Sequence, residues 1–225
     1  MEVAPESAVP RFVGAAFVAQ FATSLAAGLL STSILSGDVG QVIAAVGADT
    51  PRVRAVVLLE LLTSIGIIAL TSLLYVALRD TVRWIATIAF ALWIAEATVL
   101  AVSMLSLYAL LDLVGASSVE PSSPAEAAIG QAAIGLHEHG GDIGMLLFCA
   151  GALLWYWLFL RTRFVPRWLS IWGLASVALV TVGTLILIWN RDVQTPILLY
   201  AAYVPFELVV GMWLVIKGTQ APPTG

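Results

Sequence analysis

Six long apolar segments, separated by shorter polar ones, dominate the pattern of hydrophobic and polar positions along the chain. An α-helix needs about 20 apolar residues to cross the hydrocarbon core of a bilayer, and each segment is close to or above that length. We therefore expect an all-α fold, a polytopic bundle of six transmembrane helices. The predicted helices are 12–35, 55–78, 84–111, 142–160, 168–189 and 196–216.

The polar segments give the expected domain organisation. The predicted parts are a cytoplasmic N-terminal segment 1–11, a six-helix transmembrane domain 12–217 that includes an outer acidic loop 112–141, and a disordered tail 218–225. A short interfacial helix is also expected around 39–46, between the first two transmembrane helices.

The acidic loop itself contains a helix-start pattern. Ser123 is placed as the cap, Pro124 as the first helical residue and Glu126 as the third, a combination typical of helix N-termini. Because glycine favours helix ends, the Gly140-Gly141 pair is expected to break this short helix before the fourth transmembrane helix begins.

Composition agrees with a membrane protein. The chain is 60% hydrophobic and 11% charged, and its mean hydropathy is +1.00, whereas soluble domains carry about 25% charged residues. Its single cysteine, Cys149, excludes an intramolecular disulfide and a cysteine-based metal cluster. The first apolar segment is long and follows an acidic start, so we expect a retained helix and not a cleaved signal peptide. The expected partner is the lipid bilayer, and nucleic acid is not expected.

Basic residues predict the orientation. If the N-terminus is cytoplasmic, seven of the ten Lys and Arg residues lie on the cytoplasmic side and three on the outer side. Because cytoplasmic loops are enriched in Lys and Arg, this split favours both termini in the cytoplasm. The cytoplasmic set is Arg11, Arg79, Arg83, Arg161, Arg163, Arg167 and Lys217.

Four stretches carry a family resemblance. The basic turn RFVPRWLSIWG (163–173) and the last helix PFELVVGMWLVIKG (205–218), together with LLYVAL (73–78) and WIAEATVLAVSML (93–105), resemble a bacterial family of six-helix integral membrane proteins classed as a domain of unknown function. The resemblance covers about 11–218. It implies the fold and a multi-pass location in the bacterial cytoplasmic (inner) membrane, and it implies no activity.

Three predicted helices carry a glutamate inside the span: Glu60, Glu96 and Glu207. An ionised carboxylate at mid-membrane costs roughly 2.5–3.5 kcal/mol, and no Lys or Arg lies within any predicted span. At about 1.5 Å per residue, Glu96 and Glu207 differ in depth by only about 5 Å. We therefore expect these two to face a shared interior cavity, with at least one of them protonated at neutral pH.

The acids can be accommodated in several ways, which the sequence leaves open. They can be protonated, bind a metal or organic cation, or line a wet cavity that is open to the outside. A plainer alternative is a neutral glutamate hydrogen-bonded to another helix. The candidate ligand- or proton-binding residues are Glu60, Glu96, Glu207, Gln20 and Tyr203.

A metal site is the other candidate. His137 and His139, with Asp142 nearby, offer ligand types that bind zinc. Residues two apart on a helix point about 200° away from each other, however, and zinc-binding helices space their ligands at i and i+4. We therefore expect no tight metal site here, and no cofactor can be named.

Three functions remain open. The first is binding of a small amphipathic or cationic ligand, or of a membrane partner, in an outward-facing polar cavity. The second is an intramembrane enzyme that uses Glu96 and Glu207 on a lipid or isoprenoid. The third is a proton-coupled small carrier with those two acids at equivalent positions of an inverted repeat.

Overall fold

The computed structural model describes residues 9–116, 123–191 and 198–219, all of whose regular structure is helical. The expectations for residues 1–8 and 220–225 lie outside this part of the chain. The helices are α1 (Val9–Thr32), α2 (Val39–Ala48), α3 (Thr50–Leu78), α4 (Arg83–Ala116), α5 (Pro124–Thr162), α6 (Arg167–Trp189), α7 (Leu198–Ala201) and α8 (Tyr203–Lys217).

Six of the described helical segments are long and apolar enough to cross a membrane. They are α1, α3, α4, α5, α6 and the segment Leu199–Lys217, which joins α7 to α8. The predicted fold class, a six-helix membrane bundle, is therefore confirmed. The expected short helix around 39–46 is also present, as α2.

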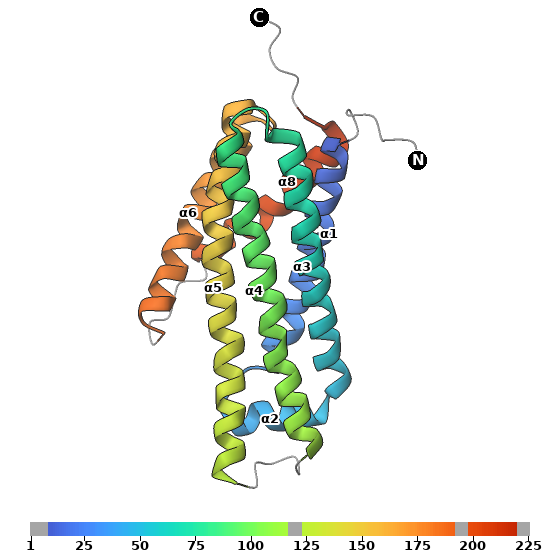
Figure 1. Ribbon diagram of the computed structural model, residues 1–225, viewed down its shortest axis with the longest axis vertical. Coiled ribbons are helices and arrows are strands. Elements are labelled where there is room, and N and C mark those ends of the chain that lie inside the picture. The colour runs from blue at the N-terminus through green and yellow to red at the C-terminus, as the bar shows by residue number, and fades with distance from the viewer. Residues whose placement is uncertain (1–8, 117–122, 192–197, 220–225) are drawn as a thin grey trace, which may run out of the picture.

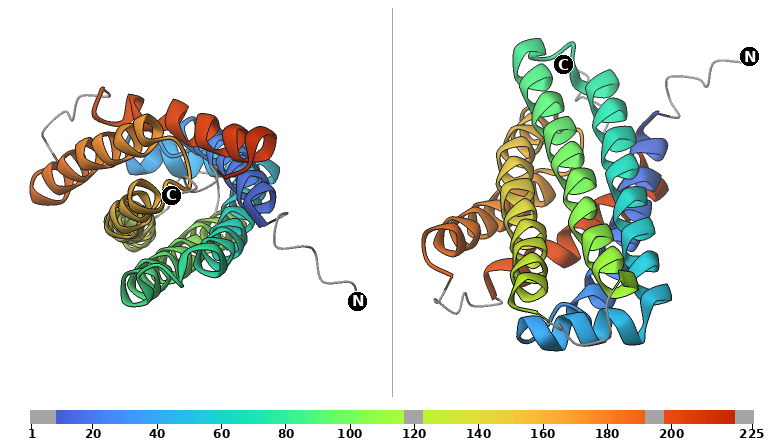
Figure 2. Two further views of the ribbon diagram at one scale, coloured as in Figure 1. Left: turned by 90° about the horizontal axis from the view of Figure 1, so that it is seen from above. Right: turned by 60° about the horizontal axis from the view of Figure 1, so that its bottom comes forward.

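The two ends of the bundle differ in character. The start of α1 and the end of α8 lie at the same end (Figure 1). We call this the basic end, because the seven residues of the predicted cytoplasmic set lie at or near the helix termini there. At the opposite end, which we call the capped end, α2 lies across α4 and α5 (Figure 2).

The segment 112–141 contains the predicted helix, but the break that was expected at Gly140-Gly141 is wrong. The helix α4 continues to Ala116, and α5 begins at Pro124 and runs through Gly140-Gly141 without a break. The predicted start of this helix is confirmed, because the Ser123 side chain accepts a hydrogen bond of 3.3 Å from the backbone N–H of Glu126.

Close packing against α4 explains the glycine at position 140, whereas a side chain at Gly141 would have no described atom within 4 Å. A side chain at Gly140 would collide with Ser103 of α4, and one at Gly151 would collide with the Trp93 ring. These glycines let the two helix backbones approach, as small residues do in membrane bundles. The indole N–H of Trp93 then donates across the interface to the carbonyl of Phe148 at 3.1 Å.

The length of α4 and α5 creates a second core. They contain 34 and 39 residues, well beyond the about 20 that cross a bilayer. At the capped end their extra turns pack with α2 and the start of α3 around a separate apolar cluster. Its buried members are Ile34, Val42, Val46, Val53, Val56, Val57, Met104, Leu107, Leu110, Ala133 and Ile134. The larger core fills the rest of the bundle and is rich in aromatic rings.

The last membrane segment is interrupted, and this interruption shapes the middle of the bundle. The expected helix 196–216 consists of the short α7 and of α8, separated at Ala202. The Ala202 carbonyl accepts hydrogen bonds from the Trp172 indole N–H at 3.1 Å and from the Ser176 hydroxyl at 3.2 Å, both on α6. Donors from a neighbouring helix thus satisfy a carbonyl at the break.

Candidate functional site

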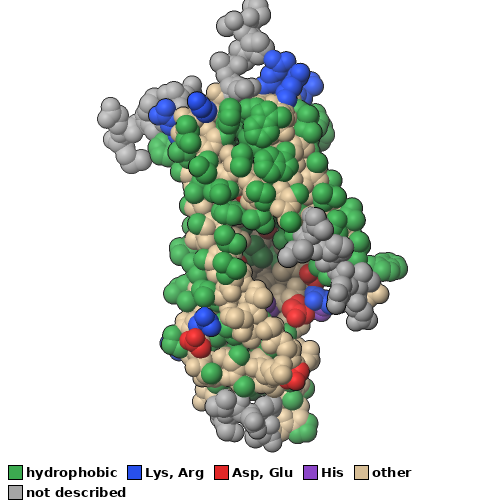
Figure 3. All heavy atoms as spheres, turned by 180° about the vertical axis from the view of Figure 1, so that it is seen from behind, with side chains coloured by type: hydrophobic (Ala, Val, Ile, Leu, Met, Phe, Trp, Pro, Cys, Tyr) green, Lys and Arg blue, Asp and Glu red, His purple; other side chains and the backbone are tan. Residues whose placement is uncertain are grey.

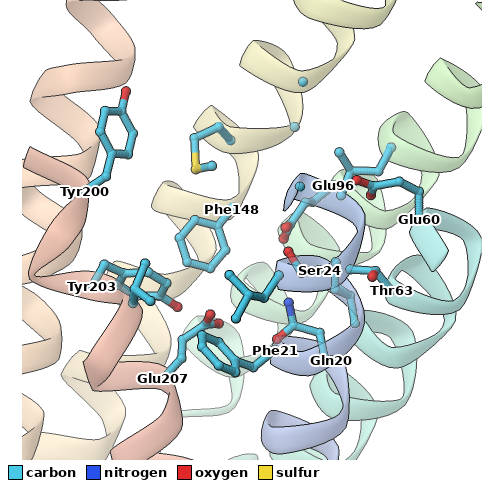
Figure 4. Close-up of a pocket in the computed structure, with 18 of the residues that line it drawn as sticks. Gln20, Phe21, Ser24, Glu60, Thr63, Glu96, Phe148, Tyr200, Tyr203 and Glu207 are labelled. Atoms are coloured by element: carbon cyan, nitrogen blue, oxygen red, sulfur yellow. The ribbon is translucent and has the colours of Figure 1, made fainter. Parts of the chain in front are cut away.

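A cavity of about 450 Å³ lies in the interior of the bundle, between α1, α3, α4, α5 and the broken last segment (Figure 4). Three glutamates from three different helices line it: Glu60 of α3, Glu96 of α4 and Glu207 of α8. We call it the glutamate cavity. Gln20 of α1 and Tyr203 of α8 also line it, so the five candidate residues from the sequence share one cavity. That they bind a ligand or a proton remains a prediction.

Glu96 is the most deeply placed of the three acids. Its side chain is 6% exposed, and its Oε2 atom is buried without a hydrogen-bond partner among the described residues. The Oε1 atom of Gln20 is likewise buried without a hydrogen-bond partner among the described residues. Leaving such a group unsatisfied costs about 1–3 kcal/mol, and more when the group is charged. The cavity therefore contains two acceptors that are suited to a donor or a cation.

Glu207 enters the cavity from the first turns of α8. Its side chain is half-buried, and the hydroxyl of Tyr203 points toward its carboxyl group (Figure 4). The Tyr203 hydroxyl is itself within hydrogen-bonding distance, 2.9 Å, of the Tyr156 hydroxyl on α5. Because Tyr203 begins α8 directly after the break, the interruption at Ala202 sets the positions of both side chains.

The position of α8 depends on a close crossing with α1. A Cβ atom added to Gly14 would lie 2.6 Å from the backbone nitrogen of Val215 and 2.7 Å from the carbonyl oxygen of Gly211. Only glycine allows the two backbones this close, as at other small-residue crossings in membranes. The crossing lies toward the basic end, and from there α1 continues along the cavity with Gln20 and Ser24 facing it.

The charge in the cavity is one-sided. Its described lining contains three carboxylates and no Lys, Arg or His. Carboxyl groups without a counter-charge in such a site are protonated, paired with a cation from outside the chain, or hydrated through the opening of the cavity. The lining also contains four aromatic rings, those of Phe21, Phe148, Tyr200 and Tyr203.

The histidine segment lies apart from this cavity and binds an arginine of the same chain. Arg191, just after α6, donates to Glu138 Oε2 at 2.9 Å and to Nδ1 of His139 at 3.0 Å, and also pairs with Asp142. His137 is not in this cluster, as expected for residues two apart on a helix. Within the part of the chain described, no group of three or more His, Cys, Asp or Glu residues could hold a metal ion.

Some lining residues had no signal in the sequence. Ser24 shares a helix face with Gln20 at a spacing of four, so it could be anticipated, although it was not a candidate. Phe148, Met145 and Tyr200 are apolar or aromatic residues within apolar segments. Nothing in their local pattern distinguishes a side chain that faces a cavity from one that faces a neighbouring helix.

Comparison with known proteins identifies a family. A family model with the description "Domain of unknown function (DUF4386)" matches residues 12–218. The chain belongs to this family. The DUF4386 match covers all six membrane-crossing segments and every residue of the glutamate cavity named above. Searches of curated proteins and of solved structures found no match.

Proposed function

We propose that this DUF4386 protein binds a small organic cation in the glutamate cavity. The observation that carries the proposal is the Glu96 carboxyl group, which is 6% exposed and has an oxygen without a described donor. It lies in a cavity with two further carboxylates and no described basic residue. A bound cation would neutralise this charge and supply the missing partner.

The cavity lining favours an organic cation over a metal ion. Its three carboxylates do not form one of the compact groups that could hold a metal. The four aromatic rings of its wall suit an ammonium group, which is attracted to the faces of such rings at about 0.5–2 kcal/mol each. Its volume of about 450 Å³ is within the range of about 300–1,000 Å³ that is typical of small-molecule sites.

The direct test is equilibrium binding of phenyltrimethylammonium to the purified protein in lipid nanodiscs. We expect saturable binding that weakens at least about tenfold in Glu96→Gln and in Glu207→Gln, because an interaction with a charged group contributes about 1.5–3 kcal/mol. Asp112→Asn is the matched control, since it removes one carboxylate from an exposed position on α4 outside the cavity. Equal affinity of the wild type and both glutamine variants would refute the proposal.

A proton-coupled carrier is the second candidate, and the broken last segment favours it. Interrupted helices beside a binding site near mid-membrane recur in secondary transporters. Here the interruption at Ala202 lies one residue before Tyr203, which lines the cavity. A cation-driven proton flux in proteoliposomes that disappears in Glu207→Gln would support the carrier. Cation binding without a proton flux would exclude the carrier and support a protein that only binds its ligand.

The proposed location is the bacterial cytoplasmic membrane, with the basic end in the cytoplasm. The seven-to-three division of basic residues supports this orientation. The capped end, with α2 and the extra turns of α4 and α5, would then project outside the cell, and the cavity would be reached from that half of the bilayer.

A further inference from the structure

The border of the glutamate cavity differs chemically from its interior. Where the cavity reaches the surface, its exposed lining residues are apolar except for one: Leu29 is 70% exposed and Val204 is 44% exposed. We call this border the mouth. Its exposed members are Leu25, Gly28, Leu29 and Thr32 of α1, Met145 of α5 and Val204 of α8. The hydroxyl of Thr32, the polar member, donates to the carbonyl of Gly28 in its own helix at 2.7 Å. The acids lie within the cavity, so the polarity changes from carboxylate to hydrocarbon toward the opening.

The mouth lies at membrane depth. At about 1.5 Å per residue from the basic end of each helix, Val204 lies about 20 Å along α8 and Leu25 about 24 Å along α1. Both depths are within the half of a hydrocarbon core about 30 Å thick that is farther from the basic end. The face that carries α1 and α8 shows a hollow at mid-height, with hydrophobic side chains above and beside it and with acidic, basic and histidine side chains below it on one side (Figure 3). The apolar part of this opening is therefore at the depth expected for lipid tails.

The course of α1 explains why this side is open. The two helices α1 and α8 touch at the crossing of Gly14 with Gly211, toward the basic end. Beyond the crossing, the last segment is interrupted at Ala202, whereas α1 continues to Thr32 along the cavity. A Cβ atom at Gly28 would have no atom of the described residues within 4 Å. Among the described residues, therefore, none packs against this position of α1.

We infer that the ligand of this cavity is a single-chain cationic amphiphile. It enters laterally from the bilayer, through the leaflet that is farther from the basic end. Its charged head contacts Glu96 and Glu207, and its alkyl chain leaves through the mouth and remains among the lipid tails. This inference rests on the proposed cation binding and adds the class of ligand and its route. A cation without an alkyl chain would instead pass the apolar mouth without making any favourable apolar contact there.

The structure suggests variants that separate head binding from chain binding. Gly28→Trp and Val204→Trp each place a large ring in the mouth, on different helices, and leave all three carboxyl groups of the cavity unchanged. Leu62→Trp is the matched control, because Leu62 is 53% exposed on α3 and does not line the cavity. An exposed apolar surface in the membrane accepts tryptophan readily, so all three proteins should fold.

The experiment measures displacement of radiolabelled phenyltrimethylammonium by dodecyltrimethylammonium in nanodiscs. The free aqueous concentrations are measured directly, because the long chain also partitions into lipid, and empty nanodiscs provide the blank. We expect Gly28→Trp and Val204→Trp to weaken dodecyltrimethylammonium at least tenfold relative to Leu62→Trp. The affinity for phenyltrimethylammonium, which has no chain to place, should fall by a smaller factor than the affinity for dodecyltrimethylammonium in the same two variants.

Other outcomes contradict the inference in distinct ways. If both probes bind and neither mouth variant differs from Leu62→Trp, the chain does not use the mouth, and the amphiphile inference fails while cation binding stands. If the mouth variants weaken both probes equally, the mouth belongs to the head site and the inference also fails. If phenyltrimethylammonium itself shows no saturable binding to the wild type, the proposed function fails and the inference fails with it.

Discussion

At the scale of single residues, the molecule is defined by carboxyl groups inside a membrane bundle. Glu96 and Glu207 were singled out because charge is costly at mid-membrane, and this cost is independent of fold detail. The same reasoning indicated that the acids should share an interior cavity, and both line the glutamate cavity. The aromatic wall was not predictable, because a phenylalanine within an apolar segment is equally compatible with lipid, core or cavity.

The protonation of the acids leads to a prediction about stability. We expect Glu207→Gln to keep the unfolding free energy within about 0.5 kcal/mol of the wild type without ligand, because Gln has the shape of the neutral acid and can accept from the Tyr203 hydroxyl. Thermal unfolding in detergent measures this, with Asp112→Asn as the control. A loss of several kcal/mol would instead indicate that Glu207 is ionised and paired in the ligand-free protein.

At the scale of helices, the lengths of the apolar segments and the Ser123 start pattern predict the structure correctly, whereas the Gly140-Gly141 pair does not. The Ser123 cap begins α5 as predicted, because a helix start depends on a few adjacent residues. Whether Gly140-Gly141 ends a helix depends on what lies beside it, and that neighbour is Ser103, 37 residues earlier in the sequence. The second core at the capped end could not be predicted for the same reason, since its members come from α2, α3, α4, α5 and the connection between α1 and α2.

The crossing of α1 with α8 gives a prediction at this scale. Gly14→Ala should destabilise the protein by about 1–3 kcal/mol, because the added methyl would overlap the backbone of α8 and force the helices apart. Gly28→Ala is the matched control on the same helix, where a side chain meets no atom within 4 Å. The measurement is thermal unfolding of both variants in the same detergent. Equal stability of the two would show that the helices are not in contact at Gly14.

At the scale of the whole molecule, the basic end of the bundle differs from the capped end, which α2 crosses. Seven of ten basic residues cluster with the helix termini at the basic end, and α2 covers the opposite end (Figure 2). The mouth of the glutamate cavity lies in the half of the bundle nearer to α2. The proposed route of the ligand therefore depends on which end faces the cytoplasm, and this can be measured.

The orientation can be tested with two aspartates at opposite ends of α4. Asp80 is in the turn before α4, with a side chain 94% exposed, and Asp112 is exposed near its other end. They lie about 48 Å apart at 1.5 Å per residue, more than the about 30 Å of the hydrocarbon core, so they should lie on opposite sides of the membrane. The native Cys149 is buried and should react little.

We expect a membrane-impermeant maleimide to label Asp112→Cys in intact cells and Asp80→Cys only after the cells are opened. The reason is that Arg residues near Asp80, among them Arg79 and Arg83, hold that turn in the cytoplasm, whereas α4 near Asp112 has none. The wild type, with Cys149 alone, is the blank. The reverse pattern would place the basic end outside, and the mouth would then open into the cytoplasmic leaflet, so that an amphiphile would reach Glu96 and Glu207 from within the cell.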